Sequence, residues 1–396
     1  MKKILFPILF ITITGNAQII TKEDSLNAGL VATDKATLVS GYGEGKVEYE
    51  MREKTGTANL TRVVLFMGHK FNEKISLFTE LELEDTKVAG GSPGGEIAME
   101  QVLLKFNLNK NNYLIGGLFV PRIGIINENH LPATFNGNNR PVVEHDVIPS
   151  TWRELGIGWY GHLKNYPSLN YSLSLMNGLN SADFESEEGI REGRFEGRNA
   201  SASNLAVSGS LLWYVNNFRI QASEYYGGTA GMTKIMGDSL KLKTGSFGTP
   251  VSLTEFDIQY SNKGFTFKGL ASMVNIPDAE TINNAYGNNV AKSMTGAYAE
   301  ISYNLLYKKH QNKKSFILFT RFETIDMQSN LSANGIANDA LKRKYFITGI
   351  TYKPVLGVSI KVDYVFRNTG VPNPFIQPGT YHTDDNFINI GLAYNF

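Results

Sequence analysis

The densest mixture of ionisable side chains lies in the stretch INENHLPATFNGNNRPVVEHD, residues 126–146. With the arginine that precedes it, the set comprises Arg122, Glu128, His130, Arg140, Glu144, His145 and Asp146. Acids and bases that face one another across a narrow opening act on passing ions, and histidine changes charge near neutral pH. What surrounds this stretch decides which chemistry it can serve.

Two other kinds of site use the same residue types. His130, Glu144, His145 and Asp146 could supply imidazole and carboxylate to zinc, but their spacing matches no zinc signature. His145 and Asp146, with Ser150 nearby, are the residue types of a hydrolase. Adjacent residues on a strand point to opposite faces, however, and a catalytic pair must be within hydrogen-bond reach. We predict no metal, no cofactor and no enzymatic activity.

The segments around this stretch alternate between apolar and polar residues. In KPVLGVSIKVDYVFRNTG, residues 353–370, Ile360, Val362 and Tyr364 alternate with Lys361 and Asp363. A period of two predicts a strand with one apolar face, which either a second sheet or lipid must cover.

Sixteen segments of this kind are expected. They are 38–51, 57–71, 74–87, 95–109, 112–122, 151–163, 169–179, 202–216, 218–228, 252–263, 265–276, 294–306, 315–327, 343–353, 358–368 and 385–396. Their connections alternate between short turns and long loops, as in transmembrane barrels, whose strand number is even in bacterial single-chain proteins. We predict an all-β fold, an antiparallel outer-membrane β-barrel over residues 18–396 with short periplasmic turns and long outer loops.

Composition and the first residues fit an exported protein. MKKILFPILFITITGNAQ predicts a signal peptide over residues 1–17. The chain has no cysteine and a formal net charge of +1, which gives no basic footprint for nucleic acid. The terminal Phe396 lies in phase with an apolar face, resembles the C-terminal signature of outer-membrane barrels, and predicts recognition by the barrel assembly machinery.

The strand pattern also predicts which side chains face the lumen and which face the membrane surfaces. The inward set is Glu80, Glu82, Glu84, Lys105, Glu255, Asp257, Lys361 and Asp363. Its acids, and Glu300, would repel anions. An aromatic girdle at the two interfaces is expected from Trp152, Trp159, Trp213, Tyr225, Tyr226, Tyr352 and Tyr394.

Residues 94–161 resemble a known family. GGEIAMEQVLLKFNL and GLFVPRIGIINENHLPATFNGNNRPVVEHDVIPSTWRELGIGWYG are similar to the porins grouped with the phosphate-selective porins O and P. The resemblance implies a sixteen-stranded and trimeric outer-membrane channel. Residues 123–150 join the fifth and sixth expected strands as the third loop on the outer side, which in sixteen-stranded porins commonly folds into the barrel and narrows it.

Together these patterns predict a porin in the outer membrane of a Gram-negative bacterium. Small hydrophilic solutes or ions would diffuse through a lumen narrowed by residues 123–150, with lipid and lipopolysaccharide around the barrel. Two alternatives stay open: a closed barrel that binds or adheres through its outer loops, including the acid and base rich 183–199, and an outer-membrane hydrolase.

Overall fold

The computed structural model describes residues 37–84, 96–308, 314–371 and 383–396. The predicted signal peptide, residues 1–17, lies outside the described residues. The strands are β1 Thr37–Glu50, β2 Thr55–Lys70, β3 Ile75–Glu84, β4 Glu96–Asn107, β5 Asn112–Phe119, β6 Glu154–Leu163, β7 Tyr166–Asn177, β8 Leu205–Val215, β9 Phe218–Gly227, β10 Val251–Asn262, β11 Phe265–Asn275, β12 Ser293–Asn304, β13 Ser315–Asn330, β14 Lys342–Val355, β15 Val358–Thr369 and β16 Asp384–Asn395. The sixteen-stranded all-β prediction is confirmed.

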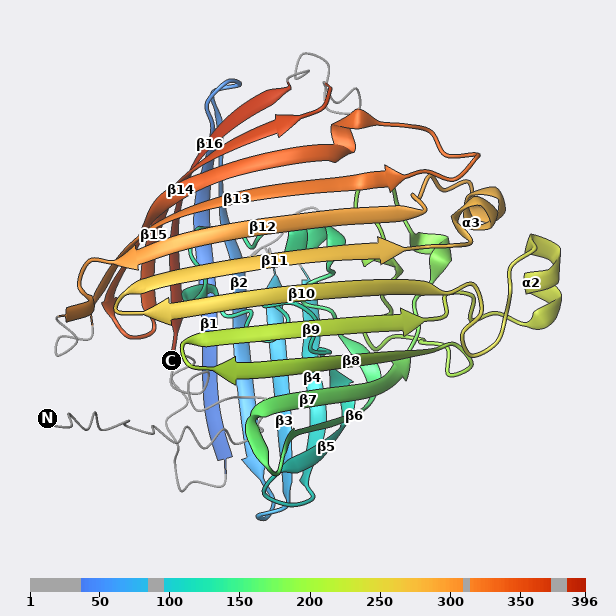
Figure 1. Cartoon of the computed structure of the whole chain (residues 1–396), viewed down its shortest axis with the longest axis horizontal. Coiled ribbons are helices and arrows are strands. Elements are labelled where there is room, and N and C mark those ends of the chain that lie inside the picture. Colours follow the sequence, from blue (N-terminus) through green and yellow to red (C-terminus); the bar gives the residue numbers. More distant parts are fainter. Residues whose placement is uncertain (1–36, 85–95, 309–313, 372–382) are drawn as a thin grey trace, which may run out of the picture.

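The strands form one closed antiparallel barrel. Each strand pairs with its neighbours in the sequence, and β1 closes the ring against β16, with Tyr42 opposite Asn395. Because the ring is closed, each of these strands has a paired neighbour on both sides. In Figure 1 β8–β13 run across the picture, and β1–β4 run behind them at a steep angle.

The two ends of the barrel differ in the length of their connections. We call them the turn end, with two-residue turns at 164–165, 216–217, 263–264 and 356–357, and the loop end, with connections such as 178–204 and 228–250. The helices α2 (Lys234–Leu240) and α3 (Ala279–Tyr286) lie at the loop end (Figure 1). The predicted alternation has two exceptions, since the first loop-end connection is the short turn 51–54 and the turn-end connection 305–314 is a longer one.

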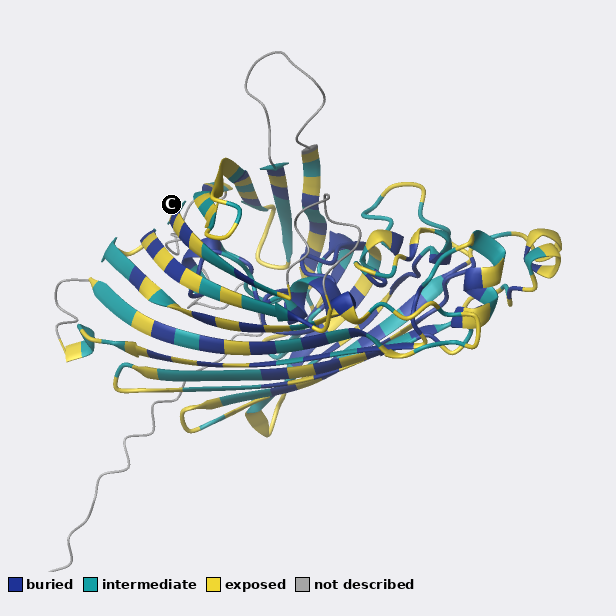
Figure 2. Ribbon diagram, turned by 90° about the horizontal axis from the view of Figure 1, so that it is seen from above, coloured by how far each residue is buried: buried dark blue, intermediate teal, exposed yellow. Residues whose placement is uncertain are grey.

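Apolar alternation explains which face of each strand points outward. On β15 Ile360 and Val362 are exposed, whereas Lys361 and Asp363 between and after them are buried. The same banding recurs along the strands in Figure 2. The barrel therefore has an apolar exterior, and the inward face of β15 carries buried charged side chains. Among the described residues, no helix is long and apolar enough to span a membrane.

The interior is occupied by the connection between β5 and β6, residues 120–153, which we call loop 3. It contains the short turns η1 (Pro132–Thr134) and η2 (Val143–Val147). Two strand glycines leave room for its close approach. A Cβ on Gly391 would lie 1.9 Å from Asn138 Oδ1, and one on Gly296 would lie 2.9 Å from Val143 Cγ1.

Other described connections contain short helical turns as well. η3 (Ser181–Asp183) and η4 (Arg191–Gly193) lie in the connection 178–204, which we call loop 4, and η6 (Asp339–Leu341) precedes β14. Loop 4 also folds back toward the barrel interior. Arg191 donates from Nη1 to the backbone oxygen of Ser150 at 2.6 Å, so the two loops are joined.

Candidate functional site

Hydrogen bonds tie loop 3 to strands that are far away in the sequence. The backbone N–H of Asn138 donates to Asp363 Oδ2 at 2.7 Å, and Lys361 Nζ donates to the backbone oxygens of Pro132 and Gly137 at 2.5 and 2.8 Å. Asp363 and Lys361 are both members of the predicted inward set. The loop backbone forms hydrogen bonds with both buried charges. These bonds explain how the inward face of β15 can carry charged side chains.

One side of loop 3 packs against β10–β13, and we call it the packed side. Val143, Val147 and Ile148 are fully buried there, in one apolar cluster with strand residues such as Met294 and Ile325. A dry, apolar contact of this kind holds the loop in one position. It also supplies loop 3 with a stabilising core that a purely polar loop would lack.

Two aromatic residues predicted for the membrane interface belong to this core instead. Trp152 and Tyr225 are fully buried, with ring centroids 4.5 Å apart. The girdle prediction is therefore wrong for this pair, because both side chains point into the barrel. Trp159, Trp213 and Tyr226 do face outward.

Glu144 is a structural anchor of the packed side. Its carboxylate accepts hydrogen bonds from the backbone N–H groups of Ile125 and Ile126 at 2.7 and 2.6 Å and from the Tyr298 hydroxyl at 2.7 Å. Burial raises its pKa to about 7, against the lowering effect of the Ile126 and Tyr298 hydrogen bonds. Although the sequence analysis groups it with the constriction residues, Glu144 borders neither of the two cavities described below.

A buried ion-pair group supports the same side. Arg321 on β13 lies 3.2 Å from Glu300 and 2.7 Å from Glu323, and all three side chains are almost fully buried. Glu323 also accepts from the backbone N–H of Val142 at 2.5 Å. Glu300 is therefore neutralised by Arg321 and is not an open acidic lining.

The opposite side of loop 3, which we call the cavity side, borders a space of about 600 Å³ at the loop end. Its lining includes six Lys or Arg and five Asp or Glu side chains: Lys46, Arg62, Arg140, Arg153, Arg191 and Arg194, and Glu44, Glu84, Asp146, Glu192 and Glu196. Arg191 and Arg194 come from loop 4, so the space lies between β1–β3 and two loops. It is polar and large enough to hold water.

Most charges around this cavity are paired. Arg62 contacts Glu44, Glu82 and Glu84 at 2.9, 2.9 and 3.1 Å. Arg140 differs, because its Nη2 is buried without a hydrogen-bond partner among the described residues.

Cations from the two loops are crowded around the same cavity. Burial and the neighbouring Arg194 lower the pKa of Arg191 to about 10, which reflects this crowding.

His145 and Asp146 also border this cavity. They contact each other, with His145 Nδ1 2.7 Å from Asp146 Oδ1, because they lie in the η2 turn and not on a strand. The expectation that adjacent residues diverge is therefore wrong here. Ser150 is fully buried, and its Oγ has no hydrogen-bond partner among the described residues, so the pair is not joined to that hydroxyl.

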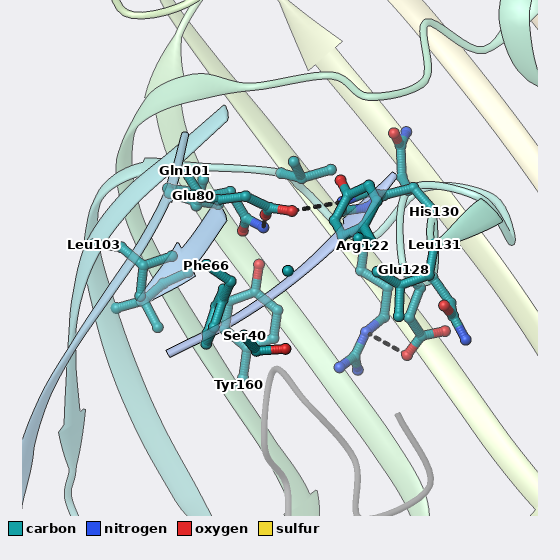
Figure 3. A pocket seen from close by; sticks show the side chains of 17 residues that line it. Ser40, Phe66, Glu80, Gln101, Leu103, Arg122, Glu128, His130, Leu131 and Tyr160 are labelled. Carbon is teal, nitrogen blue, oxygen red and sulfur yellow. Dashed lines mark hydrogen bonds and ion pairs between the residues drawn. The ribbon is translucent and has the colours of Figure 1, made fainter. Parts of the chain in front are cut away.

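A second cavity, of about 110 Å³, lies nearer the turn end and is shown in Figure 3. Arg122 and Glu128 border it and form an ion pair at 3.3 Å. Glu128 also pairs with Arg219 of β9. Arg219 in turn reaches Asp257 of β10 at 2.7 Å, so this predicted inward acid is neutralised.

His130 also borders this second cavity. Its Nε2 is 3.4 Å from Glu80 Oε1 and 3.7 Å from Glu100 Oε2 (Figure 3 shows Glu80 and His130 pointing toward each other). Burial by itself lowers the pKa of His130, but the carboxylates of Glu100 and Glu80 outweigh it and raise the pKa above its usual value.

Glu100 is a site residue that the sequence analysis missed. The ladder between β3 and β4 pairs Glu80 with Gln101 and then Leu81 with Met99, which leaves Glu100 without a strand partner. Such a β-bulge turns an additional side chain to one face. The signal in the sequence is a break in phase: among the large apolar residues, the alternating series 97, 99 is followed by 102, 104 and 106, although Leu103 partly hides the change.

The other predicted inward residues also face the interior. Glu82 is buried against Arg62, whereas Glu84 is half-exposed at the loop end. Glu255 is buried and accepts from the Ser223 hydroxyl, and Lys105 Nζ lies 4.2 Å from the centre of the Tyr113 ring. The acids are thus mostly paired and covered, so they do not form the anion-repelling surface that the sequence suggests.

Comparisons by sequence leave the family open. No protein-family model matches the chain. An uncharacterised protein of Aquifex aeolicus (strain VF5) is 27% identical over 345 residues, which are 84% of this chain and 76% of that protein.

Solved structures share the fold. The outer membrane channel DcaP of Acinetobacter baumannii matches with a TM-score of 0.55 and 13% identity, over 91% of this chain and 97% of DcaP. Salmonella typhi OmpF matches with a TM-score of 0.55 and 12% identity, over 91% and 97%. The anion-selective porin of Comamonas acidovorans matches with a TM-score of 0.55 and 9% identity, over 91% and 99%. The chain therefore has the closed sixteen-stranded barrel fold that outer-membrane porins also adopt.

Proposed function

We propose that this protein is an outer-membrane porin of a Gram-negative bacterium, through which small hydrophilic solutes or ions diffuse. The observation that carries the proposal is a closed barrel with an apolar exterior, in which loop 3 is held on one side and leaves a polar cavity of about 600 Å³ on the other. An apolar exterior without open edges is the form in which strands can cross a membrane.

Loop 3 serves as the constriction in this proposal. Its packed side fixes its position, and its cavity side presents Arg140, His145 and Asp146 to whatever passes. Charged side chains in a narrow passage set ion preference. Because Arg140 Nη2 has no hydrogen-bond partner in the part of the chain that the structure describes, and bases outnumber acids in the lining by one, the preference is weakly for anions.

Assembly and family membership are part of the same proposal. We assign the barrel to the phosphate-selective porin O and P family on the resemblance of residues 94–161, and we expect a homotrimer. A solved OmpT structure of Vibrio cholerae is described as a trimer form and matches with a TM-score of 0.52. Phe396 would be read by the barrel assembly machinery, and lipid and lipopolysaccharide would surround the exterior.

No chemical step is assigned to the protein. The residue types expected for a hydrolase include His145 and Asp146, but their contact lacks the Ser150 hydroxyl as a partner. A nucleophile must be within hydrogen-bond reach of its base to be activated. Passage by diffusion through the cavity needs no such arrangement.

Single-channel recording of the purified, folded protein in a planar bilayer tests the proposal. Discrete open steps are expected, and a potassium chloride gradient should give a reversal potential of the sign for weak anion preference. A reversal potential of the opposite sign would overturn the role of the arginines. Silence from protein that is shown to be folded would overturn the channel and favour a closed barrel that binds through its outer loops.

A further inference from the structure

We propose that Glu80, Glu100 and His130 form a binding site for a zinc-type divalent cation that joins loop 3 to the barrel wall. One ligand atom from each of the three residues lies within 4.8 Å of the other two. The residues come from β3, β4 and loop 3, so only the folded barrel brings them together.

The separations suit one small metal ion. Zinc binds carboxylate oxygen and imidazole nitrogen at about 2.0–2.2 Å, which in a tetrahedral site places neighbouring ligand atoms roughly 3.4 Å apart. His130 Nε2 lies 3.4 Å from Glu80 Oε1 and 3.7 Å from Glu100 Oε2. Magnesium and calcium prefer oxygen ligands alone, so the imidazole favours a transition metal.

The surroundings of the two carboxylates also fit. Gln101 Nε2 donates to Glu80 Oε2 at 2.8 Å, and the Tyr42 hydroxyl donates to Glu100 Oε2 at 3.1 Å. Hydrogen bonds of this kind orient metal-binding carboxylates. Glu100 is fully buried, and its Oε1 has no hydrogen-bond partner among the described residues. A cation held by both carboxylate oxygens of Glu100 would satisfy this second oxygen as well.

The bulge in β4 provides independent support. It turns Glu100 inward beside Gln101, so that two consecutive side chains serve the same face. Without the bulge, a strand would place only one of them there. A buried acid introduced by a break in the ladder costs stability unless its charge is matched, and bulges of this kind are common beside binding sites.

The location predicts an effect on passage, and this part rests on the proposed function. Glu80 and His130 border the smaller cavity. Tyr42 also borders it, and Glu44, the next residue of β1 that faces inward, borders the larger cavity. A bound cation would hold loop 3 to β3 and β4 beside the smaller cavity and so limit movement of the loop. Zinc is therefore expected to lower single-channel conductance.

Calorimetric titration of the full folded protein in detergent with zinc chloride tests the site itself. One saturable site per chain is expected, with affinity lowered at least about tenfold in Glu100→Gln and in His130→Gln. His145→Gln is the matched control, because His145, Asp146 and Glu188 form the other cluster of this kind among the described residues. Calcium or magnesium chloride should not saturate the site. Absence of saturable zinc binding, or equal binding by wild type and His130→Gln, would overturn the proposal.

A second variant keeps the test valid if those proteins fold poorly. The chain has no cysteine, so Glu100→Cys introduces a single thiol. Cobalt chloride should then give a thiolate charge-transfer band that disappears when His130→Gln is added. Glu84→Cys is the control and should give no band, because Glu84 lies on β3 like Glu80 but is not one of the three proposed ligands. An equal band in both single variants would contradict the site.

Conductance separates the site from the channel. If wild type conducts and zinc lowers its conductance while His130→Gln is unaffected, both ideas stand. If the protein binds zinc but never conducts, the proposed function fails and the site remains. If it conducts but shows no saturable zinc binding, the site fails and the channel remains.

Discussion

The two sides of loop 3 differ in the chemistry of their side chains, which are apolar on one side and charged on the other. On the packed side Val143, Val147 and Ile148 are fully buried among apolar strand residues. On the cavity side Arg140, His145 and Asp146 border a polar space of about 600 Å³. The two sets alternate within a few positions of one another, so a single short segment presents both.

The difference shows how a loop inside a barrel can keep a fixed position and still present charged side chains to water. Apolar burial and matched buried charges give the free energy that holds the backbone, while side chains that face water contribute little to it. Substitutions on the packed side should therefore change stability, and substitutions on the cavity side should change ion preference. This separation can be tested with pairs of similar substitutions.

Removing Arg321 should have the largest effect. Arg321→Ala leaves Glu300 and Glu323 buried without their cation, and breaking a buried pair in this way costs about 3–5 kcal/mol. Denaturant unfolding of the folded protein in detergent measures the change. A loss below about 1 kcal/mol would show that the packed side does not hold loop 3.

Removing the Glu144 carboxylate should be the next largest change. Glu144→Ala leaves the backbone N–H groups of Ile125 and Ile126 without this acceptor, and we expect a loss of about 1–3 kcal/mol in the free energy of unfolding. We also expect noisier open-channel current, because the loop loses its anchor. Unchanged stability, measured by thermal unfolding in detergent, would contradict the anchoring role.

Glu144 should also make the free energy of unfolding depend on pH, with a smaller effect than the two substitutions above. The pKa of Glu144 is about 7 in the folded protein against a usual 4.5, so the folded state binds the proton more tightly. The free energy of unfolding should therefore rise as the pH falls from about 7 toward 4.5 and should be insensitive to this group above pH 7.

Glu144→Gln isolates this contribution from other titrating groups. The amide oxygen can still accept from the two backbone N–H groups, and the Tyr298 hydroxyl can accept from the amide nitrogen. Melting temperatures of the variant should change less between pH 7.5 and pH 5 than those of wild type. Parallel curves for the two proteins would exclude Glu144 as the titrating group.

Removing Arg140 should change stability least. Because its Nη2 has no hydrogen-bond partner within the described ranges, Arg140→Gln is expected to alter the free energy of unfolding by less than about 0.5 kcal/mol. The reversal potential in a salt gradient should nevertheless move toward cation preference. Arg198→Gln, at an exposed position of loop 4 outside the cavity lining, is the control and should leave it unchanged.

Much of the barrel was predictable because strand alternation is local. The expected segment 218–228 corresponds to β9 Phe218–Gly227, and 358–368 corresponds to β15 Val358–Thr369. The inward positions of Lys361 and Asp363 follow from the same period of two. The inward position of Glu100 was not predicted, because a single bulge shifts the period of the strand. The break in phase is a weak signal without the pairing of β3 and β4.

The sequence by itself determined the strands, their inward and outward faces, and the place of the loop that interrupts them. Only the tertiary structure decided which loop residues face a cavity and which anchor the loop. It also placed His130 at the smaller cavity and His145 at the larger one. The reason is distance along the chain. Alternation depends on neighbouring residues, whereas the partners of loop 3 lie far away, as for Asn138 and Asp363, which are 225 positions apart.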